Sequence, residues 1–594
     1  MTCQSTKSST PPRRSTDVRW GIACLVVVAS IAARAAPTTR TTKPAPSDEW
    51  TRPAQEAARQ KRLGSFAGDV EPRLKRLLEN VKQSDLDQLI RLATLREFAR
   101  YFARVENPDE GQIDTLAWLA TQPRLVTQLM MSASVADPPD RVLEVLRSLR
   151  GDFRKDLDDN AELAAAMCVV WDAPERFGVE EDPKIVPEQI CRVFGYFLKQ
   201  SSRVQGDVHK TPVDALIHVV DLDLSEAEVQ WALNRYGGRA NVAAIMTDVP
   251  YREGVGYEKT AGEPNENSYI LPNILRNGGT SDVAAYYASE IAKLGGIPTV
   301  VCRAVGVTDG VPIVWVASLP SGAKPTWDLN SARYAEYAGW PGETTDPQTG
   351  QAIPDAELSL TGLLCATPAR ERLASIAIFK SLDLLDPKQS PALLERAIEL
   401  SPGNARAWYA YAALAAAGKL TDDQLKSFEK LTMSRLKEYP RFALLVRLRA
   451  LQGRGTLEFT DGIERIMTDF AQQPDVVALA LLARADHERE DKRDPEAIAT
   501  LVDLLRKHGS SPPLAWMAVT RLEGLLRGTD DTPKLLEVYE NVFNAIPRPP
   551  QTLYGRSLPY YRIGEKYAAL LDEMKQQQQA AAVRSKYQYI VRDR

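Results

Sequence analysis

Apolar residues recur at helical spacing along most of the chain. From Ser281 to Leu294 they fall at every third or fourth position, which is the pattern of one buried helix face. Between about Trp50 and Lys199 the same spacing predicts several helices, and after Ala366 the chain is almost wholly helical. Breaks such as Asn107-Pro108 separate the N-terminal helices. The pattern therefore predicts a mainly α-helical protein.

The stretch that follows residue 296 changes to a β pattern. Gly295-Gly296 ends the preceding helix, and Val300–Val307 is rich in β-branched residues. Asp309-Gly310 is a strong hairpin signal, and Val311–Leu319 forms the next strand. A third strand begins at Thr326. We predict one helix followed by a three-stranded antiparallel meander, which is an α+β unit inside the helical chain.

Two predicted helices carry capping residues. Thr280, Ser281 and Asp282 supply side-chain oxygens that suit the start of the helix ending at Leu294. The run Leu224-Ser225-Glu226-Ala227-Glu228 opens a second capped helix, which stops at Gly237-Gly238. Both helix starts are therefore well defined in the sequence.

The C-terminal part repeats. Prolines recur between helices at intervals of 34 to 38 residues, at Pro402, Pro440, Pro474, Pro512 and Pro549. A period near 34 is that of paired-helix repeats. The segment Ala397–Asn404, with Ala407-Trp408, is similar to a tetratricopeptide repeat junction. The resemblance implies a solenoid whose concave face binds a peptide or protein; the alternative is an array that only braces the preceding domain.

The N-terminus reads as an export signal. Arg13, Arg14 and Arg19 precede an apolar run from Gly21 to Ala33, and Ala33-Arg34-Ala35 suits signal peptidase. We expect a periplasmic or secreted protein with no membrane span in the mature chain. Retention through an uncleaved anchor is the alternative.

Charge and cysteine content narrow the partners. The chain of 594 residues has a net charge of −4, and removal of the predicted leader takes away +4, leaving about −8. This net charge does not favour binding to nucleic acid or to an anionic membrane.

The mature chain keeps Cys168, Cys191, Cys302 and Cys365. Cys168–Cys191 is the nearest candidate disulfide, and buried free thiols are equally compatible with the sequence.

The helix and meander resemble the catalytic core of the transglutaminase-like superfamily, a branch of the papain-like cysteine enzymes. Its motifs are G-x-C at a helix start, G-I-P after that helix, A-W in a strand and W-D in the next strand. They are matched by Gly279-Thr280-Ser281, Gly296-Ile297-Pro298, Val314-Trp315 and Trp327-Asp328. The resemblance implies a papain-like fold in which a Cys, a His and an Asp carry acyl transfer.

Two of those three positions have changed residue type. Ser281 stands at the Cys position and Ile313 at the His position, while Asp328 keeps the family's Asp. A serine hydroxyl needs a general base more than a thiol does. We therefore expect a degenerate, non-catalytic domain. The alternative is an acyl-transfer enzyme, a protease or amidase, that uses Ser281 with Asp328 and a base from elsewhere, such as His218 or Lys324.

Other chemistry has little support in the sequence. HExxH, CxxC and Walker glycine patterns are absent, so we expect no metal and no cofactor. Ser321-Gly322-Ala323-Lys324 fits S-x-x-K but falls in a predicted turn. Cys302 lies in an alternating strand and reads as a core residue. It is the second place to look for a nucleophile.

The predicted architecture is mainly α and multidomain, with an N-terminal helical region, an α+β core and a C-terminal helical-repeat solenoid. We expect an exported protein that binds a protein partner in the cell envelope. The predicted boundaries are a signal peptide at 1–35, a linker and lead-in at 36–65, a helical domain at 66–205, a transglutaminase-like domain at 206–345 and helical repeats at 366–594.

Overall fold

The computed structural model describes residues 48–173, 185–199, 208–237, 241–258, 265–306, 313–320, 325–333, 339–549 and 558–587. From Glu49 onward the chain forms one compact unit. The predicted leader and residues 36–47 of the predicted linker and lead-in lie outside the described residues, as do Asp309, Gly310, Ser321 and Lys324. The protein is mainly helical, as its hydrophobic pattern predicts, and contains one small antiparallel sheet.

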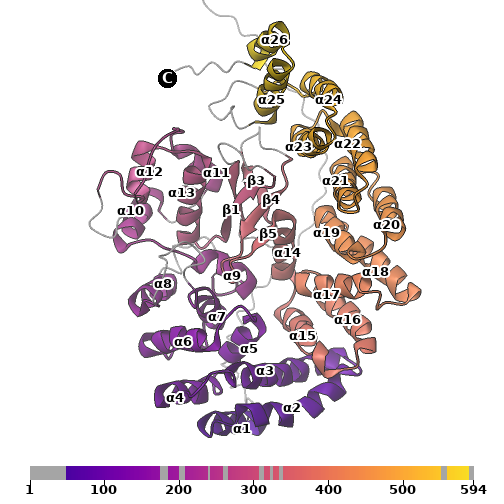
Figure 1. Ribbon diagram of the computed structural model, residues 1–594. Helices are drawn as coiled ribbons and strands as arrows, with labels where there is room; N and C mark the ends of the chain where they lie inside the picture. Colours follow the sequence, from indigo (N-terminus) through magenta and orange to yellow (C-terminus); the bar gives the residue numbers. More distant parts are fainter. Residues whose placement is uncertain are drawn as a thin grey trace, which may run out of the picture. The chain divides into compact units, whose positions relative to one another are not determined.

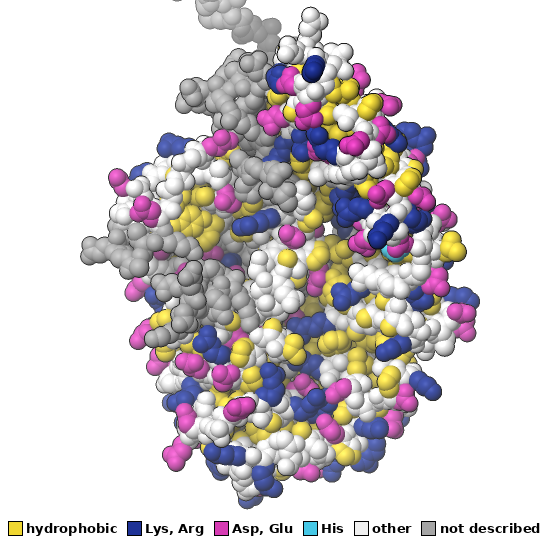
Figure 2. Space-filling model, viewed as in Figure 1, with side chains coloured by type: hydrophobic (Ala, Val, Ile, Leu, Met, Phe, Trp, Pro, Cys, Tyr) yellow, Lys and Arg dark blue, Asp and Glu magenta, His cyan; other side chains and the backbone are white. Residues whose placement is uncertain are grey.

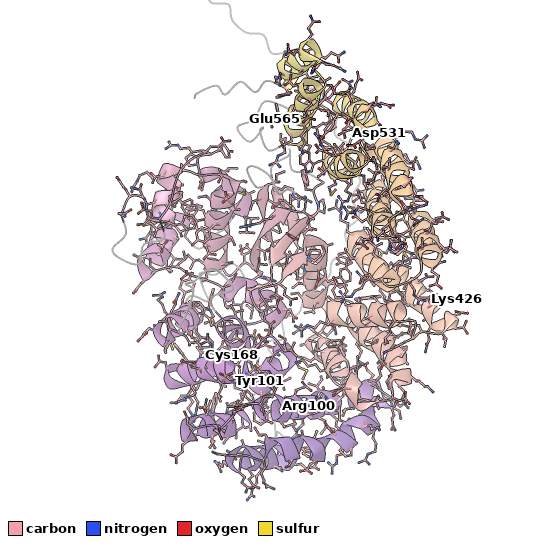
Figure 3. All side chains as sticks on the ribbon, viewed as in Figure 1. Arg100, Tyr101, Cys168, Lys426, Asp531 and Glu565 are labelled. Atoms are coloured by element: carbon pink, nitrogen blue, oxygen red, sulfur yellow. The ribbon has the colours of Figure 1, made fainter. Side chains whose placement is uncertain are left out.

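The N-terminal region is a set of packed helices (Figure 1). Buried apolar side chains hold α2 against α3 and α5 against α7, and α6 packs on both α7 and α8. The Tyr101 hydroxyl donates to the Asp137 carbonyl at 3.0 Å within this interior (Figure 3). The helices are α1 Asp48–Arg59, α2 Leu63–Leu78, α3 Leu86–Phe102, α4 Glu110–Leu119, α5 Pro123–Ser132, α6 Pro139–Phe153, α7 Ala161–Val170 and α8 Pro187–Lys199.

The middle of the chain combines helices with the sheet. Ser225 and Glu228 form the predicted capping box of α10, and Gly237 ends that helix in a left-handed conformation. The helix predicted from Ser281 to Leu294 is α13, with the same bounds. The helices are α9 Val213–Val220, α10 Glu226–Tyr236, α11 Val242–Asp248, α12 Leu271–Asn277 and α13 Ser281–Leu294.

The sheet has five strands in the order β3-β2-β1-β4-β5, with every neighbouring pair antiparallel. The predicted meander is therefore incomplete, because β4 pairs with the other edge of β1 and β5 pairs with β4. Cys302 lies opposite Trp315 in the register of β1 and β2. The strands are β1 Thr299–Ala304, β2 Val314–Ser318, β3 Asp328–Ala332, β4 Gly342–Thr345 and β5 Ala352–Pro354.

The two faces of the sheet belong to different hydrophobic clusters. Val314 and Val316 pack with α13, whereas Ile313 and Trp315 pack with α14 and the later helices. Successive residues of a strand point to opposite faces, so this division follows from the register. All five residues of β2 are buried. The sheet is thus covered by α13 on one face and by C-terminal helices on the other.

The C-terminal part is a series of helices in which most pack on the next, while α17 packs on α16 and α19 (Figure 1). We call α15 to α26 the helical array. Pro440, Pro474 and Pro512 each stand at the start of a helix, where a missing N–H removes no helical hydrogen bond. The helices are α14 Asp355–Ala366, α15 Ala369–Lys380, α16 Ser390–Leu400, α17 Ala405–Ala416, α18 Asp422–Arg435, α19 Pro440–Leu451, α20 Thr456–Asp469, α21 Pro474–Glu490, α22 Asp494–His508, α23 Pro512–Gly528, α24 Thr532–Ala545, α25 Pro559–Glu573 and α26 Gln577–Tyr587.

The array also contacts the N-terminal helices. Helix α15 packs along α3, and the buried Arg96 guanidinium of α3 donates to the Asp383 carboxylate at 2.6 Å. The first helices and the array therefore belong to one unit. None of the helices that the structure describes is both long and apolar enough to cross a bilayer.

One sequence prediction is corrected here and one open alternative is decided. Thr280 occupies the N-cap position of α13, but its side chain does not cap the helix, because its hydroxyl donates to the Asp282 carboxylate instead. Of the two alternatives left open for the cysteines, the structure has free thiols, since Cys168 and Cys191 are not joined. Burial raises the pKa of each, which keeps both protonated at neutral pH.

Candidate functional site

The residues predicted at the catalytic positions, Ser281, Ile313 and Asp328, lie in different elements of the core. Ser281 begins α13 and its side chain is 0% exposed. Ile313 lies in the cluster on the opposite face of the sheet from α13, with Cys302 and Trp315. A side chain at position 313 therefore packs in a different hydrophobic cluster from the apolar residues of α13.

Asp328 has a local structural role. Its carboxylate accepts hydrogen bonds from the backbone N–H groups of Asn330 at 3.0 Å and Ser331 at 2.8 Å. Burial raises the pKa of Asp328, but the hydrogen bonds from Ser331 and Asn330 outweigh it and leave the pKa lowered. The turn at the start of β3 therefore stabilises the ionised carboxylate of Asp328.

The two alternative bases do not complete the site either. His218 lines a cavity with Ser289, Glu290 and Lys293, which lie in the C-terminal half of α13. Ser289 is eight residues beyond Ser281, or about 12 Å along the helix axis. Lys324 lies outside the described residues. The assignment of Ser281 and Asp328 to catalysis stays a prediction.

A polar site inside the core surrounds His218. This residue lies on α9, is 2% exposed and packs its ring edgewise against Trp327, with ring centroids 5.7 Å apart. It lines two neighbouring cavities, one of about 120 Å³ and one of about 460 Å³. His218 therefore forms a shared wall between two polar spaces.

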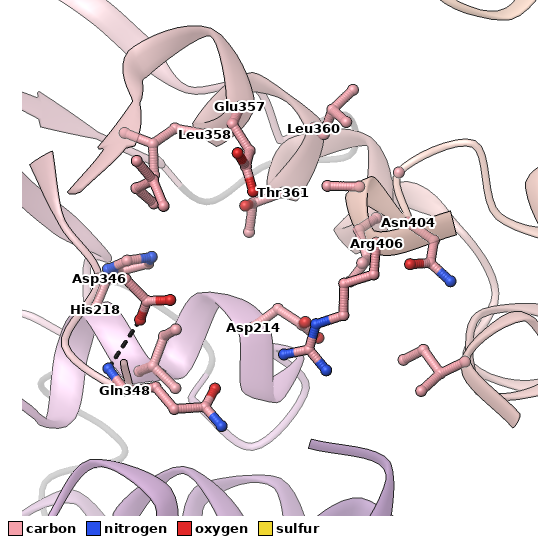
Figure 4. Close-up of a pocket in the computed structure, with 16 residues that line it drawn as sticks. Asp214, His218, Asp346, Gln348, Glu357, Leu358, Leu360, Thr361, Asn404 and Arg406 are labelled. Carbon is pink, nitrogen blue, oxygen red and sulfur yellow. Dashed lines mark hydrogen bonds between the residues drawn. The ribbon is translucent and has the colours of Figure 1, made fainter. Parts of the chain in front are cut away.

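The smaller cavity lies between α9, the turn that joins β4 to β5, α14 and the start of α17. Figure 4 shows the charged ends of Asp346, Glu357 and Arg406 turned toward the same space. Asp214 and His218 of α9 complete its polar wall. Asp346 accepts from the backbone N–H of Gln348 at 2.8 Å, which fixes the carboxylate (Figure 4).

The charges of this cavity are shaped by burial. Burial lowers the pKa of His218 to about 4, although nearby Asp346 raises it, so the imidazole is neutral at physiological pH. Burial raises the pKa of Glu357, against the hydrogen bond that the Tyr409 hydroxyl donates to its carboxylate at 2.7 Å. With His218 neutral, the remaining ionisable side chains of the wall formed by α9, α14 and the β4–β5 turn are carboxyl groups.

The larger cavity holds a buried ionic cluster. Lys293 Nζ donates to Asp221 Oδ2 at 2.8 Å and to Glu290 Oε1 at 3.0 Å, and all three side chains are nearly buried. Burial raises the pKa of Glu290 to about 7, even though Lys293 lowers it. Burial lowers the pKa of Lys293, but the two carboxylates outweigh burial and leave it raised.

Sequence reasoning named His218 as a possible base but missed the rest of this site. The Lys293–Glu290 pair is three residues apart on α13, a spacing that places both side chains on one side of a helix. The turn residues between Asp346 and Gly350 signalled a hairpin that would have revealed β4 and β5. Arg406 stood in the repeat junction, with nothing in the sequence to link it to α9.

His218 is a weak general base in this arrangement. A neutral imidazole with a pKa near 4 is a weak base at neutral pH, and the described residues hold no reactive thiol or metal-ligand group beside it. The opposed charges around the smaller cavity suit a small polar ligand.

No known protein-family model matches the sequence, and no curated protein matches it. The resemblance to transglutaminase-like cores therefore rests on the motifs alone.

Proposed function

We propose that the protein is an exported scaffold of the cell envelope, in which a transglutaminase-like core without catalytic activity supports a helical array that binds a protein partner. The burial of Ser281 is the observation that carries the non-catalytic part. A nucleophile must touch its substrate, and a fully buried side chain cannot do so without a rearrangement of α13. The separation of Ile313 from Ser281 by the sheet supports the same view.

The surface of the array supports the binding part. A groove of about 240 Å³ runs between α18, α19 and α20, and we call it the array groove. Charged residues of both signs line it, including Arg454, Glu458, Asp461 and Arg465. Leu457 lies beside it and is 81% exposed. Figure 2 shows basic and acidic side chains interspersed over the array, which suits a partner of mixed charge more than a polyanion.

The first experiment tests catalysis. The purified mature chain and its Ser281→Ala variant are incubated with a fluorophosphonate probe, with ester and amide substrates, and with glutamine-containing peptides plus a primary amine. We expect no Ser281 labelling and equal background rates for the two proteins. Labelling of Ser281, or an activity that Ser281→Ala removes, would show a working acyl-transfer enzyme and refute the proposal.

The second experiment tests the array. A photo-crosslinking amino acid replaces Leu457 in the exporting cell, and the crosslinked protein is identified and purified for a direct binding measurement. We expect Arg465→Glu and Asp461→Lys to weaken that binding at least tenfold, because each reverses a charge of the array groove. The matched control is Lys534→Glu on α24, an exposed lysine outside the groove. Equal binding by all variants would exclude the array groove as the partner site.

A further inference from the structure

The cavity between α9, α14 and α17 holds opposite charges that do not meet. We propose that it binds a free α-amino acid with a basic side chain, of the lysine and arginine class. The ligand carboxylate would meet Arg406, and the two cationic groups would meet the acidic wall. This proposal concerns the cavity alone and is independent of the protein partner of the array.

Arg406 forms the part of the cavity that would bind the carboxylate of the ligand. Among the described residues its guanidinium forms no ion pair, and Figure 4 shows it turned into the cavity. Arg406 lies in the first turn of α17, a helix of 12 residues, where the helix dipole is positive. A guanidinium binds a carboxylate through two parallel hydrogen bonds. The cation and the helix end thus act on the same anion.

The walls opposite Arg406 would bind the cationic groups of the ligand. Asp214, Asp346 and Glu357 come from α9, the β4–β5 turn and α14, and none forms an ion pair with another described residue. With His218 neutral, three carboxylates against one guanidinium leave an excess of two negative charges. A ligand with one carboxylate and two cationic groups reduces that excess. A neutral amino acid would leave it unchanged.

His218 provides the second, independent sign of a ligand. It lines the cavity with a side chain that is 2% exposed, and its Nδ1 has no hydrogen-bond partner among the described residues. A buried polar atom without a partner costs about 1–3 kcal/mol. A rotation of the imidazole that turns this atom toward the cavity would let it accept a hydrogen bond from an ammonium group. A bound amine would therefore satisfy a group that the protein leaves unsatisfied.

The size and composition of the cavity restrict the occupant further. At about 120 Å³ it is below the roughly 300–1,000 Å³ of sites for drug-sized ligands. A divalent cation is disfavoured, since the described residues contain no group of three metal-ligating side chains. A simple diamine would leave Arg406 facing the cavity without a counterion. A dicarboxylate would place one anion against the acidic wall. A basic amino acid avoids both faults.

The test is calorimetric titration of the purified mature chain with three probes. L-Lysine carries all three groups, cadaverine lacks the carboxylate, and L-norleucine lacks the side-chain ammonium. We expect L-lysine to bind at least tenfold more tightly than either. Arg406→Gln should weaken L-lysine at least tenfold and should not weaken cadaverine, because loss of the guanidinium only increases the negative excess of the cavity. The matched control Arg435→Gln, an exposed arginine at the end of α18, should change neither.

A variant of the acidic wall tests the other half of the site. Glu357→Gln should weaken L-lysine and cadaverine alike, because both carry the ammonium groups. The far-ultraviolet circular dichroism of each variant confirms its fold, and the wild-type ranking of the three probes decides the matter if a variant fails to fold. Absence of L-lysine binding at 10 mM, or cadaverine binding as tight as that of L-lysine, would overturn the proposal.

Discussion

Replacement of Lys293 by methionine should destabilise the core in a pH-dependent way. The change removes the cation that pairs with Asp221 and Glu290 in the buried ionic cluster of the larger cavity, while the flexible methionine side chain keeps much of the volume. The side chains of the three residues are 7%, 13% and 5% exposed, so water screens them little. The variant therefore leaves two buried carboxylates without a partner cation.

The expected magnitude follows from the burial of the cluster. Removal of one partner from a buried ion pair costs about 3–5 kcal/mol, which is a factor of about a hundred or more in the local opening equilibrium. In the wild type the folded pKa of Glu290 is about 7, above its ordinary value of 4.5. The folded state then holds a proton that the unfolded chain releases, so stability falls as the pH rises from about 4.5 to about 7.

Loss of Lys293 should widen this window. Without the cation both carboxylates hold their protons to higher pH, and the variant should lose roughly half as much stability at pH 5 as at pH 8. Hydrogen exchange of α13 amides measures the effect, with α21 amides as the internal reference. Lys437→Met, at an exposed lysine, is the matched control, and Lys293→Met/Glu290→Gln should recover part of the loss. Equal exchange in Lys293→Met and wild type at pH 8, or a loss that is the same at both pH values, would refute the reasoning.

Three other substitutions test the core. Gly278→Ala should lower stability by at least about 3 kcal/mol in urea unfolding, because φ +76° and ψ −170° are open essentially only to glycine and the new Cβ would lie 2.2 Å from the Pro250 carbonyl oxygen. Gly342→Ala should cost about 1–3 kcal/mol and alter tryptophan fluorescence, since its Cβ would lie 2.5 Å from the Trp315 ring. Ser281→Cys should give a thiol that iodoacetamide alkylates slowly at pH 7, because the position is fully buried.

Each of these predictions has a clear contrary result. Gly64→Ala is the control for the glycine series, because a Cβ at Gly64 meets nothing within 4 Å and alanine favours the helix. A Gly278→Ala or Gly342→Ala protein as stable as Gly64→Ala would contradict the proposed crowding. Rapid alkylation of Ser281→Cys would place an accessible, activated nucleophile at the start of α13.

The sequence predicted an element correctly where several local signals agreed. Helix α13 has the predicted bounds because its apolar period, its N-terminal residues and its glycine stop coincide. The short strands β4 and β5 were missed, since β4 pairs with β1 across a separation of about 40 residues and local pattern carries no record of that pairing. The cap at Thr280 was wrong because two side chains bond each other in place of the backbone.

The site was harder to predict for a related reason. The sequence pointed to His218 only as a possible base for Ser281. The cavity beside it is closed by Arg406, almost 190 residues further along the chain. Whether opposite charges at such a distance pair or stay apart depends on packing between helices. The positions at 281, 313 and 328 were set by motif spacing, but the alternation along β2 decides which of them share a face.

Because helices cover both faces of β2, the core around this strand can be completed only after the C-terminal helices have been synthesised. Trp315 and its neighbours share a hydrophobic cluster with α23, whose Trp516 indole also donates to the Gly306 carbonyl at 3.3 Å. These helices are synthesised about 200 residues after β2, which is a delay of roughly 10–40 s at 5–20 residues per second. Throughout that interval the second layer on this face of the sheet is incomplete. A chain truncated before α23 should therefore expose part of this hydrophobic cluster.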